Sequence, residues 1–174
     1  LWNVYGFFVL YANLDRPELT RPLHPASRPA TDRWLVSSVH ALIQDVTKRL
    51  EGFDATGAAR RIRDFVVDDL SNWYVRRNRK RFWKSGDPVD QASAYQALYE
   101  ALTTVAKLIA PLAPFLAEAL YRNLVGSVDR DAPVSVHLTE WPLADPERVD
   151  ERLMRDMEAL VRVVELGRAA RAQS

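Results

Sequence analysis

The sequence predicts an all-α protein, a bundle of four to five helices with a short extended arm. Apolar residues recur at spacings of three and four over most of the chain after residue 30, which is the period of a helix with one buried face. Prolines and glycines separate these stretches at short intervals, as is typical of antiparallel neighbours in a helical bundle. Only one short stretch alternates in the manner of a strand.

The first thirty residues differ from the rest of the chain. Residues 1–14 are aromatic and apolar on all sides, as in a helix packed in a larger interface. Residues 15–30 contain four prolines and predict an extended linker, because proline lacks the amide donor that a helix needs. We expect residues 1–30 to be a connecting segment and residues 31–174 to be a helical domain. The chain begins with leucine rather than methionine, so we expect it to be a fragment of something larger.

Two helices are expected in the first half of that domain. The first has a capping residue at its start, Thr31 or Asp32, and Gly52 at its end. The second starts near Asp54 or Thr56, and a Gly-Asp-Pro sequence ends it.

The second half of the domain is predicted to contain a third and a fourth helix, then a short extended arm, and then a last helix. The third helix runs from about Asp90, and Pro111 and Pro114 separate it from the fourth. Apolar and polar residues alternate over 134–139; one strand cannot make a sheet, so we expect an extended arm lying on the helices. Asp145 is expected to cap the last helix, with a proline at its first position. The apolar stripe of this last helix consists of Val149, Leu153, Met157, Leu160 and Val164.

One segment, Arg76–Lys84, separates this chain from a generic bundle. It contains six cations and no acid, with aromatic residues inside and beside it. At about 100° per residue, Arg76, Lys80 and Lys84 fall on the same face as the core stripe that reaches Trp73. Unpaired cations are too costly to bury, so the helix must leave the bundle after about Trp73, or the bundle must open there into a polar groove.

A basic surface flanked by aromatic side chains is suited to bind an anionic ligand, and RNA is the simplest candidate for that ligand. Guanidinium groups pair with phosphates in fork geometry, and each contact releases counterions. The aromatic residues Trp83, Phe82 or Tyr74 are of the type that stacks on unpaired bases. The alternative interpretation stays open, because basic residues near the end of a helix also complement its dipole and commonly form a solvated face.

The sequence predicts no catalytic and no metal site. It contains no cysteine, which excludes disulfides and thiolate zinc sites, and its three histidines lack acidic or nucleophilic partners at a useful spacing. The adjacent Asp68 and Asp69 point about 100° apart, and we expect them to pair with arginines such as Arg61. There is no glycine-rich phosphate loop, no nucleophile motif and no run that would span a membrane.

Several motifs resemble those of isoleucyl-tRNA synthetases, class I enzymes of the isoleucine, valine and leucine subclass. Asp64–Arg77, running into Arg81-Phe82-Trp83, resembles their signature helix. The run around 72–74 favours the isoleucine enzymes over the valine enzymes. Further similar segments are residues 1–5, 31–37, 110–118 and 136–142, in the order that the subclass has them.

The resemblance implies a fold and a role. Residues 31–174 are expected to be a helical anticodon-binding domain that docks the anticodon stem and loop of tRNA, with residues 1–30 joining it to a catalytic domain. The parent enzyme would ligate isoleucine to tRNA in the cytoplasm, with ATP and magnesium, whereas this chain is expected to hold no cofactor. The expected partners are tRNA and the catalytic domain, and no membrane. Carried over position by position, the RNA-binding candidates are Arg76, Arg77, Arg79, Lys80, Arg81, Trp83 and Lys84.

Other functions stay open at this point. The chain could be the corresponding domain of the valine or leucine enzyme, or a regulatory RNA-binding protein with the same fold. It could also be a non-catalytic protein-interaction bundle whose basic helix end docks an acidic partner. The salt dependence of tRNA binding separates this last function from RNA binding, because each phosphate contact releases counterions.

Overall fold

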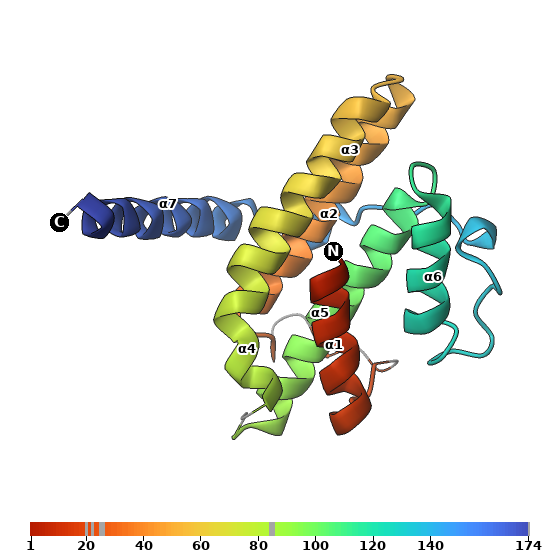
Figure 1. The fold of residues 1–174 in the computed structure, drawn as a ribbon, viewed down its shortest axis with the longest axis horizontal. Coiled ribbons are helices and arrows are strands. Elements are labelled where there is room, and N and C mark those ends of the chain that lie inside the picture. The colour runs from red at the N-terminus through yellow and green to blue at the C-terminus, as the bar shows by residue number, and fades with distance from the viewer. Residues whose placement is uncertain (20, 22, 25–26, 84–85, 174) are drawn as a thin grey trace.

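The computed structural model describes residues 1–19, 21, 23–24, 27–83 and 86–173, and in these residues it contains helices and no strand (Figure 1). The predicted all-α bundle is confirmed. The elements are α1 (Trp2–Asp15), α2 (Ala30–Glu51), α3 (Ala55–Asp64), the π-helix η2 (Phe65–Val75), α4 (Arg76–Trp83), α5 (Pro88–Ile109), α6 (Pro114–Leu124), the 3-10 turns η3 (Val136–Leu138) and η4 (Pro146–Arg148), and α7 (Glu151–Gln173).

The segments α3, η2 and α4 form one continuous helical column, which packs along α2 (Figure 1). Helix α5 lies against both α2 and the column, and it also contacts α1 and α6. Helix α7 contacts α2 near its start and then projects away from the bundle (Figure 1). We refer below to α3, η2 and α4 together as the column.

The core lies where α2, α5 and the column meet. Leu42, Phe65 and Leu98 are fully buried there, and each side chain of this size contributes about 1.5–3 kcal/mol when it is removed from water. Helix α1 joins the same core through Val4 and Phe8. The division of the chain at residue 30 stays a prediction.

Most helix ends lie where local signals predict them. Gly52 follows the last residue of α2, and the Asp54 side chain caps α3 by accepting a hydrogen bond from a backbone amide. The third helix begins slightly earlier than predicted, at Pro88, where Asp87 is the cap. Pro114 begins α6. The described residues between α1 and α2 form no α-helix, as predicted, although Pro22 and Pro25 lie outside them.

Two cap predictions are wrong. Neither Thr31 nor Asp32 caps α2, because the helix already begins at Ala30 and the Asp32 side chain turns into the core. Asp145 caps the 3-10 turn η4 instead of the last helix, which begins only at Glu151. In that helix Met157 is buried and Leu153 and Val164 are partly buried against the core, as predicted, but Leu160 is 49 % exposed although the next residue, Val161, still packs on the core.

The arm packs on the helices, as expected, but it is not extended throughout. Residues 136–138 form the turn η3, because the Glu118 carboxylate accepts hydrogen bonds from the Ser135 hydroxyl and the Val136 amide and draws the chain onto α6. Further along, the Trp141 indole donates to Thr47 on α2 over 2.8 Å.

Glu100, on α5, fastens the end of the arm to the bundle. Its carboxylate lies 2.7 Å from Arg148 of η4, 3.5 Å from the buried Arg28 and 3.6 Å from His40 of α2. His40 also accepts a hydrogen bond from the Asp145 amide, so its role is structural, as predicted. Burial alone would raise the pKa of Glu100, but His40, Arg148 and Arg28 lower it to about 2.

We predict that Glu100→Gln lowers the free energy of unfolding at pH 7 by about 2 kcal/mol, because the buried Arg28 and the half-buried Arg148 lose their counter-charge. The pKa of Glu100 is depressed in the folded state, so its contribution is present above its ordinary value of 4.5 and is lost as the pH falls toward 2. Urea titrations at several pH values measure this.

The matched control is Glu165→Gln on the exposed part of α7, which should change stability by less than about 0.5 kcal/mol. A difference between Glu100→Gln and the unmodified chain that stays constant from pH 7 to below pH 3 contradicts the assignment of Glu100.

Candidate nucleic-acid interface

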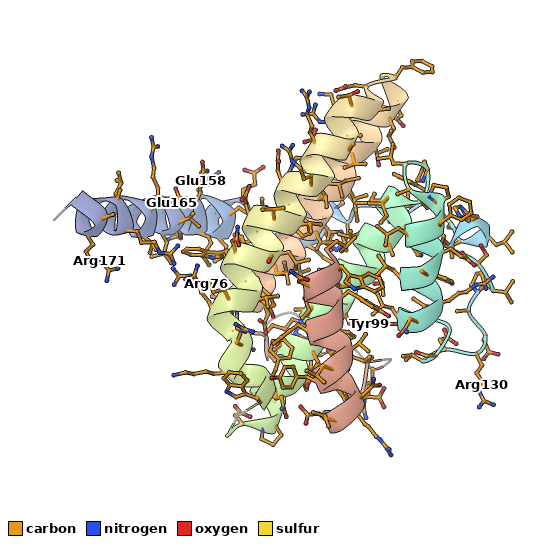
Figure 2. All side chains as sticks on the ribbon, viewed as in Figure 1. Arg76, Tyr99, Arg130, Glu158, Glu165 and Arg171 are labelled. Carbon is orange, nitrogen blue, oxygen red and sulfur yellow. The ribbon has the colours of Figure 1, made fainter. Side chains whose placement is uncertain are left out.

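The structure places the predicted RNA-binding residues in different environments. Arg76, Arg77, Arg79 and Lys80 are exposed on the column, where Figure 2 labels Arg76. Trp83 is 52 % exposed, and the Arg81 side chain is only 15 % exposed. The last candidate, Lys84, lies outside the described residues.

The prediction that the cations continue the core stripe is wrong, and η2 is the physical reason. A π-helix closes its hydrogen bonds over five residues instead of four, so each turn holds more residues than the α-helical wheel assumes. Over the eleven residues of η2 this difference accumulates and changes which side chains of α4 face inward. The buried positions are Tyr74, Asn78 and Phe82. Helix α4 therefore stays packed on α5, and Arg76 and Lys80 point outward.

A buried carboxylate holds α4 in this rotation. Asp32 of α2 is 0 % exposed and accepts hydrogen bonds from the Tyr74 hydroxyl at 2.8 Å and the Ser93 hydroxyl at 2.5 Å. Two nitrogens of the Arg81 guanidinium donate to its two oxygens over 2.7 and 2.8 Å, in the fork geometry of a bidentate pair. We call Asp32, Tyr74, Arg81, Asp90 and Ser93 the Asp32 network.

Arg81 has no donor left for a phosphate. Its remaining N–H groups donate to the carboxylate and backbone carbonyl of Asp90, both over 2.8 Å, and to the Asn78 side chain over 3.0 Å, so all five guanidinium donors are used. Burial alone would lower the pKa of Arg81, but Asp32 and Asp90 raise it overall, so the guanidinium stays charged. This geometry speaks against Arg81 as an RNA contact and makes it a positioning residue.

The sequence did not reveal this network. Asp32 and Asp90 lie 49 and 9 residues from Arg81, so no local spacing connects them. Asp32 also stands in the first turn of α2, where an acid usually complements the helix dipole from the surface. The sequence feature that indicates the observed inward face of α4 is the four-residue spacing of Tyr74, Asn78 and Phe82.

The exposed cations keep their charge available. None of Arg76, Arg77, Arg79 and Lys80 forms a salt bridge with an acid among the described residues. Arg77 instead lies over the ring of Trp73, with 3.6 Å from its central carbon to the ring centre. Such cation–π contacts orient a guanidinium without neutralising it.

Of the aromatic residues considered for stacking on bases, only Trp83 is accessible. Tyr74 and Phe82 are buried, and burial together with the charge of Asp32 raises the pKa of Tyr74, so its hydroxyl remains a donor inside the Asp32 network. Trp83 lies edge-on to Tyr11 of α1, with 6.3 Å between the ring centres.

The acids of η2 do not assemble a reactive site. Burial raises the pKa of Asp69 to about 6, and the charge of Arg61 opposes this shift, so Arg61 is a neighbour as predicted. Arg61 nevertheless forms its salt bridge with Asp45, at 3.5 Å. In the part of the chain that the structure describes, no three His, Asp or Glu residues are arranged to hold a metal ion. None of the helices described there has the length together with the hydropathy that a membrane span requires.

Residues 32–174 match the family model described as the anticodon-binding domain of tRNA ligase. The chain belongs to this family. The predicted family resemblance is thereby confirmed, and α4 with its four exposed cations is part of an anticodon-binding domain.

The whole chain is also similar to individual curated proteins over 98 % or more of its length. It is 59 % identical over 174 residues to the isoleucine–tRNA ligase of Thermus thermophilus, 55 % identical over 171 residues to that of Deinococcus radiodurans, and 49 % identical over 174 residues to that of Dehalococcoides mccartyi. The three alignments include 100 %, 98 % and 100 % of this chain, respectively. The chain spans only 17 %, 15 % and 17 % of the length of the three relatives.

We predict that Asp32→Asn lowers the free energy of unfolding by about 3 kcal/mol, because it leaves the Arg81 guanidinium buried with too little counter-charge. Urea denaturation followed by circular dichroism measures the change. The control is Asp156→Asn, which removes an exposed partner of Arg152 on α7 and should cost less than about 0.5 kcal/mol. Equal losses in the two variants contradict a structural role for Asp32.

Proposed function

We propose that this anticodon-binding domain binds the anticodon stem and loop of tRNA for an isoleucine–tRNA ligase. The observation that carries the proposal is the set of four exposed cations at one end of the column, none of which is neutralised by a described acid of the chain. Family membership and the names of the relatives support the choice of ligand.

In this proposal Arg76, Arg77, Arg79 and Lys80 contact RNA phosphates. Arginine contributes fork-shaped donor pairs, and lysine contributes a compact charge. Trp83 stacks on an unpaired base, which a half-exposed aromatic ring at the end of a basic helix is suited to do. Lys84 extends the same basic run in the sequence.

The proposal for the parent enzyme follows the relatives. Residues 1–30 connect the domain to a catalytic domain, which ligates isoleucine to its tRNA with ATP and magnesium in the cytoplasm. This chain supplies binding and orientation to that reaction, because its sequence carries none of the catalytic motifs.

A second candidate, a protein-interaction bundle, has one observation in its favour. Helix α7 projects from the bundle and exposes Leu160, Val163 and Leu166 (Figure 1). An exposed apolar helix face is typical of a protein contact. A chain that only made this apolar contact would not bind tRNA with the salt dependence of phosphate contacts, so the titration below separates the two functions.

The test is a titration of the 174-residue chain with a transcript of Thermus thermophilus isoleucine tRNA, at several KCl concentrations between about 50 and 300 mM. We predict that log Kd rises linearly with log salt, and that Arg77→Gln and Lys80→Gln each weaken binding and reduce the slope by about one. Lys80→Gln should alter the free energy of unfolding by less than about 0.5 kcal/mol, because its side chain is exposed. Arg77→Gln also loses the cation–π contact with Trp73 and should lower the free energy of unfolding by up to about 1 kcal/mol.

The matched control is Arg130→Gln, in the loop that follows α6, well away from Arg76 in Figure 2. This variant should bind like the unmodified chain. Binding that does not change with salt, or a loss in Arg130→Gln as large as that in Lys80→Gln, contradicts the proposed function.

A further inference from the structure

A groove of about 440 Å³ lies between α1 and the column, beside the exposed cations. Its polar and charged lining comes from Asn3 of α1, from Ser71 and Asn72 of η2, and from Arg76 and Arg79 of α4. Helix α1 precedes residue 32, where the match to the family begins, so the family match does not include the α1 side of this groove.

The groove is lined by apolar side chains, by neutral polar side chains and by two cations. Its apolar part includes Val4 and Val75, which are buried in the core. The side chains of Asn3, Ser71 and Asn72 form no hydrogen bond with any described residue, although each contains a donor and an acceptor. None of the described residues that line the groove is acidic.

Helix α1 is a fixed wall of this groove. The ring of Phe7 packs edge-on against buried Phe82 of α4, with 5.1 Å between ring centres, so the core holds α1 in register with the column. The guanidinium of Arg79 lies 5.7 Å from the centre of the same Phe7 ring. Arg79 is thus oriented across the groove towards α1.

We propose that this groove binds the ribose–phosphate backbone of the RNA, and that α1 contributes a contact through Asn3. The inference rests on the proposed function and extends the RNA surface beyond the basic helix end. Arg76 and Arg79 pair with phosphates, because the groove offers two cations and no competing acid.

The three neutral side chains determine which backbone fits. A ribose 2′-hydroxyl is both donor and acceptor, and so are the amides of Asn3 and Asn72 and the hydroxyl of Ser71. Deoxyribose lacks this hydroxyl and leaves those groups unpaired. The groove therefore favours RNA over DNA of the same sequence and shape. An acidic peptide would use the two arginines but would not make this distinction.

The test compares an RNA oligonucleotide of the isoleucine anticodon stem and loop with the DNA oligonucleotide of the same sequence, each titrated with the 174-residue chain. We expect Asn3→Ala and Asn72→Ala each to weaken RNA binding by about three- to tenfold, with an unchanged salt slope because no charge is removed. DNA binding should change by less than about twofold, so the preference for RNA falls. Arg79→Gln should weaken both ligands and reduce the slope by about one.

The matched control is Asn13→Ala, which removes the same exposed side chain from the other end of α1. If Asn3→Ala and Asn72→Ala bind both oligonucleotides as Asn13→Ala does, while Lys80→Gln still weakens binding, the groove proposal is overturned and the proposed function stands. If the unmodified chain shows no salt-dependent RNA binding, the proposed function itself fails.

Discussion

The architecture of the basic surface depends on one buried ion pair, between Asp32 and Arg81. A carboxylate with no exposure to water is tolerated only when charge and hydrogen bonds replace its hydration. Arg81 and the Tyr74 and Ser93 hydroxyls supply both, and in doing so they connect α2, η2, α4 and α5. The pair therefore fixes the rotation of α4 about its own axis.

That rotation determines which cations remain available to a ligand. With Arg81 turned inward, the π-helix before it leaves Arg76, Arg77, Arg79 and Lys80 facing outward, unpaired by described acids. One arginine of the basic run thus stabilises the fold, and its neighbours form the surface. The position of α1 follows from the same packing, since Phe7 rests on Phe82 of α4.

The sequence predicted features that have local causes. The end of α2 at Gly52, the start of α3 after Asp54 and the start of α6 at Pro114 depend on neighbouring residues, and the sequence predicts them. The same local reasoning places the start of α5 at about Asp90, two residues late. No local sequence feature distinguishes the eleven residues of π-helix from an α-helix. The α-helical wheel through Trp73 therefore predicts the wrong inward face for the residues of α4. Asp32 is distant from Arg81 in the sequence, so no local spacing predicts their ion pair. Asn3 lies in a segment without an amphipathic face, so the sequence does not predict it as a binding residue.

A double-mutant cycle on the ion pair tests this dependence most directly. The free energies of unfolding of the unmodified chain, Asp32→Ala, Arg81→Ala and the double variant give the coupling energy between the two side chains. A buried bidentate pair predicts a coupling of about 2 kcal/mol or more. Additive losses, with a coupling within about 0.5 kcal/mol of zero, would show that the rotation of α4 is set by something else.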